Sequence, residues 1–428
     1  MRILEIFKMI LNIINPLFLF NFLLIYLCKI LTKCRFFYFQ IVILNIYTIC
    51  FKGRDSKLIM LLANSYSQQR DVKNEYNTLK KFYLLNTIKN NDDIARIGYL
   101  SVIQGNFQFT KKLLIDNKNN KILFFFLLAI YNSRKPPFID YHSFIKVADF
   151  YKKKKFPIEN YIKVSSNIVG YNKKKIIKSR KFYLRNFIIG EENKNKNKKN
   201  CFILISCNLE FFDIFSEHYV ANFRKFNDQI VHFHIVSNNS KKEIINKFNI
   251  LNNSYKNLGL SIEKEQKKNK VYITMTRFLI SRQLMEYYKS DVFINDIDLT
   301  PCYNMNLIIK KISTKKYNVG FYDEHQKIPW TRFAAGVCFF KYKDKQSSKF
   351  LKKLTNFYDY KIKYYEQLFW SADQFGLALI QNIMNKKLKI FNFYDYKNIL
   401  DFNKIVYVPR TLALKKIKSK FNNRKIDE

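Results

Sequence analysis

Residues 291–298 read D-V-F-I-N-D-I-D, an apolar run that ends in two carboxylates one residue apart. Because alternate side chains of a strand share a face, we expect Asp296 and Asp298 to point the same way where a strand leaves its sheet. Mg²⁺ and Mn²⁺ are bound by a few carboxylate oxygens and complete their shell with phosphate and water. The octapeptide therefore predicts a Mg²⁺ or Mn²⁺ site that also holds a diphosphate. The structural alternative is that Asp298 caps a turn or a helix.

The segments around this octapeptide alternate between short apolar runs and helical patterns. Residues 201–206, C-F-I-L-I-S, and residues 230–237, I-V-H-F-H-I-V-S, predict buried strands because they are short, apolar and rich in β-branched residues. Residues 291–295 predict a third strand. Further strands are predicted at 317–323 and 335–342, and helices at 210–226, 276–288, 346–365 and 372–384. This alternation is typical of an α/β layer with a largely parallel sheet.

The composition indicates packed domains and disfavours a nucleic-acid partner. The chain has 428 residues, of which 48% are apolar and 17% aromatic, enough for the cores of two or three domains. Its net charge is +43, but only 14 of its 76 basic residues are Arg, whereas nucleic-acid sites usually rely on Arg. Asn, Ile, Phe and Tyr are also abundant, which A/T-rich codons explain. Seven cysteines without a C-x-x-C pair indicate neither a zinc site nor a disulfide framework, which fits a reducing cytoplasm.

Two uncharged runs open the chain, at residues 9–28 and 36–51. The first is long enough to cross a bilayer. Lys29, Lys33 and Arg35 lie between the runs, and the positive-inside rule disfavours two spans for a cytoplasmic enzyme. Residues 1–54 therefore predict an apolar helical segment that contacts a membrane, as one span or as an interfacial hairpin. The alternative is that both runs are buried helices of a helical domain.

Residues 55–135 predict a helical-repeat domain. The pattern of residues 61–72 recurs near residues 97–107, where Gln104-Gly105-Asn106 repeats the polar turn of Gln69-Arg70-Asp71 after 35 residues. This spacing resembles tetratricopeptide repeats and implies a protein partner, although generic helical hairpins would give a similar pattern. Pro136-Pro137 begins a connector that extends to residue 200 and ends in the low-complexity sequence E-E-N-K-N-K-N-K-K-N. Residues 201–428 then form the predicted α/β domain.

Further candidate site residues lie near the octapeptide in sequence. Arg277 precedes the strand on a predicted helix, where a guanidinium could bind a base or a phosphate. Gly336, in F-A-A-G-V, allows a backbone to approach a ligand closely. Trp330 and Arg332 are candidates for an acceptor pocket, because sugars stack on aromatic rings and bond to planar donors. A core or rim position for Trp330 is the alternative.

Asp373 and Gln374 begin a predicted helix and are the candidate catalytic residues. A carboxylate or an amide there could reach a reacting sugar, since glycosyl transfer passes through an oxocarbenium-like state. The alternative for Asp373 is stabilisation of the first helical turn by the helix dipole. His325, in a polar loop, is either a further metal ligand or an exposed residue. His232 and His234 share one strand face, which predicts a hydrogen-bonded pair in the core.

Four motifs in this order resemble the GT-A glycosyltransferases, the nucleotide-diphospho-sugar transferase superfamily, over residues 201–384. They are R-F-L at 277–279, I-N-D-I-D at 294–298, A-A-G-V at 334–337 and W-S-A-D-Q at 370–374. The resemblance implies a GT-A, Rossmann-like mixed sheet domain preceded by an all-α helical-repeat domain. It also implies that Asp296 and Asp298 bind Mn²⁺ or Mg²⁺ on the diphosphate of a nucleotide-sugar. Some retaining members carry an Asp-Gln pair near the donor sugar, but this chain continues with Phe375-Gly376-Leu377 where they usually have Asp and Asn, so no stereochemical outcome is implied.

The expected function is metal-dependent transfer of a sugar from a nucleotide-diphosphate sugar to a glycan or protein acceptor, as in polysaccharide biosynthesis. The expected location is the cytoplasm or the cytoplasmic face of a membrane. A non-enzymatic, membrane-associated helical-repeat scaffold with a degenerate α/β domain is the alternative. A basic nucleic-acid binder is the third hypothesis, and its affinity would fall steeply with salt.

Overall fold

The computed structural model describes residues 16–34, 36–50, 56–69, 71–85, 88, 90–134, 139–140, 142–147, 188–189, 201–265, 270–299, 304–314, 316–323, 329–364, 371–384 and 387–396. The chain divides into two compact units. One comprises Met1–Arg134 and His142–Lys163, and the other comprises Lys135–Tyr141 and Val164–Glu428.

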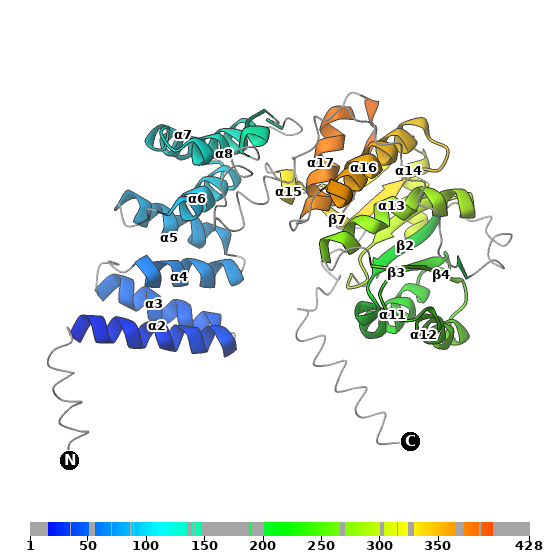
Figure 1. Ribbon diagram of the computed structural model, residues 1–428, viewed down its shortest axis with the longest axis horizontal. Helices are drawn as coiled ribbons and strands as arrows, with labels where there is room; N and C mark the ends of the chain where they lie inside the picture. Colours follow the sequence, from blue (N-terminus) through cyan, green and yellow to red (C-terminus); the bar gives the residue numbers. More distant parts are fainter. Residues whose placement is uncertain are drawn as a thin grey trace, which may run out of the picture. The chain divides into compact units, whose positions relative to one another are not determined.

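In its described residues, the first unit is all-helical. Its helices are α2 (Pro16–Cys34), α3 (Phe37–Cys50), α4 (Ser56–Gln68), α5 (Val72–Leu84), α6 (Asn91–Ile103), α7 (Phe107–Asp116) and α8 (Lys121–Asn132). The start of α6 lies 35 residues after that of α4, and the start of α7 lies 35 residues after that of α5. Helical hairpins at the predicted period are therefore present, and their membership of the tetratricopeptide family stays a prediction. In Figure 1 these helices stack on one another, with α2 at one end.

Local polar contacts explain where these helices begin and how neighbours are joined. The side chains of Asp71 and Asn106 accept hydrogen bonds from backbone N–H groups in the first turns of α5 and α7, which makes both residues N-caps. Arg96 of α6 donates from Nε to Glu75 of α5 at 2.7 Å and from Nη1 to Asn64 of α4 at 2.7 Å. One buried cation thus connects three helices.

The apolar segment at the start of the chain belongs to the same unit as the hairpins. Leu24 of α2 and Leu44 of α3 share a core with Leu58 and Leu62 of α4. The contacts therefore join residues that the sequence analysis assigned to separate segments at residue 54. No helix in the described ranges has both the length and the sustained apolar character needed to cross a bilayer.

The second unit is an α/β domain. Its strands are β1 (Ile188–Ile189), β2 (Cys201–Cys207), β3 (Val231–Val236), β4 (Leu258–Glu263), β5 (Asp291–Asn295), β6 (Val319–Asp323), β7 (Phe333–Phe340) and β8 (Ile390–Asn392). Its helices are α11 (Leu209–Arg224), α12 (Lys241–Ser254), α13 (Lys270–Tyr288), α14 (Met305–Thr314), α15 (Pro329–Arg332), α16 (Lys345–Tyr364), α17 (Ala372–Met384) and the 3₁₀ helix η4 (Phe393–Tyr396).

The described strands form one eight-stranded mixed sheet in the order β1-β4-β3-β2-β5-β7-β6-β8. Strands β4, β3, β2 and β5 are parallel to one another, whereas β7 is antiparallel to both β5 and β6. β1 is antiparallel to β4, and β8 is parallel to β6. The predicted class is confirmed at the level of architecture: in the described residues, an α/β domain with a mixed sheet follows an all-helical part.

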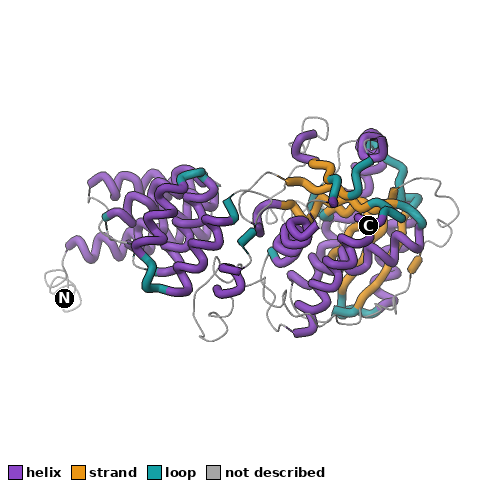
Figure 2. Tube along the Cα trace, turned by 90° about the horizontal axis from the view of Figure 1, so that it is seen from above, coloured by secondary structure: helices purple, strands orange, loops and turns teal. Residues whose placement is uncertain are grey.

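Helices cover both faces of this sheet, as Figures 1 and 2 show. Alternate residues of β2 point to opposite faces. Ile203 and Ile205 belong to the core that contains Phe212 of α11 and Phe248 of α12. Phe202 instead contacts Tyr288 of α13, with 4.8 Å between ring centroids. All five residues of β5 are buried, so the strand that leads into Asp296 and Asp298 runs through the middle of the domain.

The predicted histidine pair is confirmed as a buried, hydrogen-bonded pair of the core. His232 Nδ1 lies 2.8 Å from Tyr288 Oη, and Ser261 Oγ lies 2.9 Å from His232 Nε2 and 2.8 Å from His234 Nδ1. His234 Nε2 lies 3.1 Å from Glu263 Oε2. Burial, together with the neighbouring His234, lowers the pKa of His232 well below its ordinary value, so that His232 is neutral.

Candidate functional site

The carboxyl end of β5 lies at a switch point of the sheet. From β2 the chain adds β3 and β4 on one side, and it then returns to place β5 on the other side of β2. Ligands of open α/β sheets bind outside the carboxyl ends of the strands at such a point. Asp296 follows Asn295, the last residue of β5, and therefore lies at this position.

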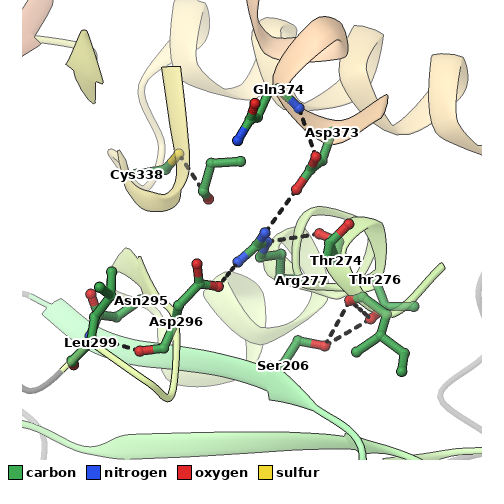
Figure 3. Close-up of polar contacts among 12 residues, drawn as sticks. Ser206, Thr274, Thr276, Arg277, Asn295, Asp296, Leu299, Cys338, Asp373 and Gln374 are labelled. Atoms are coloured by element: carbon green, nitrogen blue, oxygen red, sulfur yellow. Dashed lines mark hydrogen bonds and ion pairs between the residues drawn. The ribbon is translucent and has the colours of Figure 1, made fainter. Parts of the chain in front are cut away.

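Arg277 of α13 connects two carboxylates that are far apart in the sequence (Figure 3). Its Nη1 donates to Asp296 Oδ1, and its Nη2 donates to Asp373 Oδ2 at 2.8 Å. Its Nε donates to the backbone oxygen of Thr274 at 2.7 Å, which holds the guanidinium in place. The structure thus brings together Arg277, Asp296 and Asp373, three of the residues that the sequence singled out.

The charges of this cluster favour the ionised form of Arg277. Arg277 is 3% exposed, and burial by itself would lower its pKa, but the charges of Asp296 and Asp373 outweigh that effect and raise it. The side chain of Asp373 is 8% exposed, whereas that of Asp296 is 39% exposed. Asp296 is therefore the carboxylate that solvent and a dissolved cation can reach.

Asn295 holds the turn that carries the two aspartates. Its Nδ2 donates to Tyr219 Oη at 2.9 Å and to the backbone oxygen of Leu299 at 3.2 Å. The backbone N–H of Leu299 donates to the oxygen of Asp296 at 3.1 Å. Asp298 lies within this turn and is half-buried. Asn295 is a site residue that its sequence context does not reveal, because its burial and its hydrogen bonds depend on the fold.

Gly336 of β7 leaves the space that the side chain of Asp296 occupies. The backbone N–H of Asp296 donates to the oxygen of Gly336 at 3.0 Å. A Cβ atom added at Gly336 would lie 1.8 Å from Asp296 Oδ2 and 2.3 Å from its Cγ. Only glycine leaves room for this carboxylate, so Gly336 acts on Asp296 directly, whereas its contact with a nucleotide-sugar stays a prediction.

Asp373 is fixed by contacts from three sides at the start of α17. Its Oδ1 accepts a hydrogen bond from the backbone N–H of Gln374 at 2.9 Å, in addition to the ion pair of Oδ2 with Arg277. Tyr358 Oη of α16 donates to the backbone oxygen of Asp373 at 2.7 Å. Tyr358, whose role no sequence motif indicates, therefore helps to hold the backbone of Asp373 in position.

Trp330 and Arg332 have contacts of a structural kind. Trp330 is 4% exposed and stacks on Phe375, with ring centroids 6.3 Å apart and ring planes 9° apart. Arg332 is buried and donates from Nε and Nη2 to Asp323 Oδ2 at 3.0 and 2.8 Å. An acceptor role for either residue stays a prediction, and the observed contacts favour the core alternative for Trp330.

Asp296 and Asp298 offer carboxylate oxygens after β5, the type of ligand that hard divalent cations prefer. Carboxylate oxygens that solvent reaches are the usual protein ligands of Mg²⁺ and Mn²⁺, which need only one or two of them. In the described part of the chain, no group of three or more His, Cys, Asp or Glu residues is placed to hold a metal. His325 lies outside the described residues. Metal binding by Asp296 and Asp298 stays a prediction.

No protein-family model matches the chain, and no curated protein sequence matches it significantly. Among solved structures, it is similar to the WbbM bifunctional glycosyltransferase, at 13% identity over 49% of this chain and 45% of that one, with a TM-score of 0.33. It is also similar to the glycosyltransferase GlyE of Streptococcus pneumoniae TIGR4, at 16% identity over 50% of this chain and 51% of that one, with a TM-score of 0.32.

A third similar structure is mouse xyloside xylosyltransferase 1, at 12% identity over 45% of this chain and 84% of that one, with a TM-score of 0.29. The chain spans about half the length of the first two proteins. All three are glycosyltransferases by name, and the likeness at these scores is distant.

Proposed function

We propose that the α/β unit is a glycosyltransferase that takes a sugar from a nucleotide-diphosphate sugar and gives it to a glycan or protein acceptor. The observation that carries the proposal is the position of Asp296. It is an accessible carboxylate at the switch point of the sheet, and the buried guanidinium of Arg277 ties it to Asp373. A site for a charged ligand, built around a fixed ion network, is what a diphosphate leaving group requires.

In this proposal, Asp296 and Asp298 would hold Mg²⁺ or Mn²⁺, which would supply positive charge to a diphosphate leaving group. Arg277 keeps Asp296 in place and adds positive charge near the diphosphate. Gly336 leaves the space that the Asp296 carboxylate occupies.

The contacts of Asp373 and Gln374 favour different roles for the two residues. Both carboxylate oxygens of Asp373 already accept charge-assisted or backbone hydrogen bonds, from Arg277 and from the N–H of Gln374. A carboxylate held by contacts on both oxygens serves to fix its partners in place. We therefore assign Asp373 to the positioning of Arg277, and the half-buried amide of Gln374 to contact with the donor sugar.

The test is a thermal-shift screen of the full chain with UDP- and GDP-sugars, with and without Mn²⁺. Binding raises the melting temperature by mass action, so we expect a rise that needs both nucleotide and cation. Asp298→Asn should abolish it. Asp213→Asn should retain it, because this partly exposed carboxylate of α11 pairs with Lys247 of α12, away from β5 in sequence.

Two results would overturn the proposal. One is a melting temperature that no nucleotide-sugar changes in the presence of Mn²⁺, as a non-enzymatic scaffold predicts. The other is a nucleotide effect that Asp298→Asn leaves intact, because the ligand would then bind elsewhere.

A further inference from the structure

The helices α2 and α3 expose a concentration of large apolar side chains, which we term the α2–α3 apolar face. It comprises Phe22, Leu23, Tyr26, Tyr38, Phe39 and Ile46, which are 60, 56, 60, 67, 62 and 57% exposed. Single exposed apolar residues are ordinary on protein surfaces, but a group of this size marks an interaction site. Four of the six are aromatic, and the rings of Tyr38 and Phe39 meet edge to face with 6.2 Å between centroids.

The opposite sides of the same helices are fixed in the protein core. Leu24 and Cys28 of α2, with Leu44 of α3, are buried against Leu58 and Leu62 of α4. The buried and exposed residues of α2 therefore lie on opposite sides of one helix. Because one side packs on protein, only the other side is available to a partner.

The position of the face within the unit is unusual for a helical stack. Figure 1 shows α2 at the end of the stack formed by the helical hairpins. End helices of such stacks normally carry a polar outer side that keeps the protein soluble. Here that side carries Phe22, Leu23 and Tyr26 instead. We therefore expect the apolar side of this end helix to contact a partner.

Charge indicates which kind of partner covers it. Residues 16–54 contain no Asp or Glu but five basic residues: Lys29, Lys33, Arg35, Lys52 and Arg54. Lys29 is exposed on α2 itself. Lys is depleted at protein–protein interfaces, whereas aromatic rings beside Lys and Arg are typical of helices that lie at the surface of an anionic bilayer. Tyr is also enriched at the level of lipid headgroups.

We propose that the α2–α3 apolar face lies on the surface of a bilayer that contains anionic lipid. The aromatic and aliphatic side chains enter the boundary between headgroups and acyl chains, and Lys29, exposed on α2, pairs with lipid phosphate and carboxylate groups. This role is independent of the chemistry of the α/β unit.

The test is flotation of the full chain with vesicles of phosphatidylcholine alone or of phosphatidylcholine with phosphatidylserine. We expect flotation with the anionic vesicles, reduced by high salt and weak with phosphatidylcholine alone. The triple variant Phe22→Ser, Tyr26→Ser and Phe39→Ser should lose at least about tenfold in vesicle affinity, because the burial of even one of the three rings contributes more than a tenfold factor. Lys29→Glu should weaken binding to anionic vesicles only.

A matched control changes exposed apolar residues elsewhere. Ile250 and Leu307, on α12 and α14, are 71 and 56% exposed. The double variant Ile250→Ser and Leu307→Ser should float like the unchanged protein. Circular dichroism should show equal helix content in all variants, because every substituted side chain is exposed.

Three outcomes would overturn the proposal. The first is that the unchanged protein does not float with anionic vesicles. The second is that the triple variant floats as well as the unchanged protein. The third is that the unchanged protein binds no vesicles but sediments as a dimer, which the triple variant does not form; the α2–α3 apolar face would then bind a second copy of the chain.

Discussion

Arg277 is the residue on which the geometry of the candidate site depends. Its guanidinium is buried, and it makes polar contacts with Thr274, Asp296 and Asp373. A buried cation is tolerated only where ion pairs and hydrogen bonds compensate for the loss of water, and the removal of one partner leaves an uncompensated charge. The side chain thus fixes α13, the end of β5 and α17 to one another.

Arg277→Met is expected to lower the free energy of unfolding by roughly 3 kcal/mol, because it leaves the buried carboxylate of Asp373 without its cation. Urea denaturation measures this loss. Arg282→Met, which changes an exposed arginine of the same helix, should cost less than about 0.5 kcal/mol. Equal losses in the two variants would contradict a structural role for the buried network.

Gly336→Ala is expected to weaken metal-dependent nucleotide binding more than about tenfold, because the new methyl group displaces the carboxylate of Asp296 by steric contact. Isothermal titration with UDP and Mn²⁺ measures the affinity. Ala334→Gly, two residues earlier on the same strand, adds no atom and should leave the affinity unchanged. An unchanged affinity in Gly336→Ala would show that the position of Asp296 does not matter for binding.

At the scale of elements, β5 carries a titratable group at each end. Asp296 follows its carboxyl end, whereas Asp291 begins it and accepts a hydrogen bond from the N–H of Tyr342 at 2.7 Å. Burial raises the pKa of Asp291 to about 6, while the Tyr342 N–H and Lys341 act in the opposite direction. The folded protein therefore holds this proton more tightly than the unfolded chain does.

The stability that this proton contributes is fully present below about pH 4 and is lost as the pH rises towards 6. Asp291→Asn should remove this pH dependence and raise the free energy of unfolding near pH 7 by roughly 2 kcal/mol. The Asn oxygen can still accept the bond from Tyr342. Urea denaturation between about pH 4 and pH 7 provides the measurement, with Asp213→Asn as the control. A parallel pH profile for Asp291→Asn and the unchanged protein would refute the assignment.

The elements show what local pattern can and cannot predict. Short apolar runs located β2, β3 and β5 to within one residue of their observed ends. Strand β4 was missed because Gly259 and Ser261 make its sequence half polar, although the hydrogen bonds of Ser261 to two histidines allow it to be buried. Helix α12 was also missed, although Ser240 and Glu243 form a capping-box pattern whose first half is observed, with Glu243 N donating to Ser240 Oγ.

At the scale of the whole molecule, the chain consists of two compact units with separate cores. The proposed ligand binds only in the α/β unit, and the proposed bilayer contact involves only the helical unit. A ligand stabilises what it binds, by RT ln(1 + [L]/Kd), or about 2.7 kcal/mol at a hundredfold excess over Kd. Its effect should therefore be confined to one unit.

Hydrogen exchange should reveal this confinement. With UDP and Mn²⁺ present, we expect slower exchange in β2, β5, α13 and α17, and unchanged exchange in α4–α8. Anionic vesicles should give the converse pattern, with protection in α2 and α3. Protection of both units by the nucleotide would contradict separate sites.

The sequence by itself determined the features that depend on neighbours along the chain: the strand that ends in two carboxylates, the alternation of strands and helices, and the period of the helical hairpins. Only the tertiary structure decided which distant side chains meet. Three sets of contacts cross between elements. Arg277 of α13 bridges to Asp296 and Asp373, and Arg332 pairs with Asp323. Ser261 of β4 hydrogen-bonds to His232 and His234 of β3. Such contacts depend on the order of strands in the sheet, and strand order is set by the packing of the whole core rather than by any local pattern.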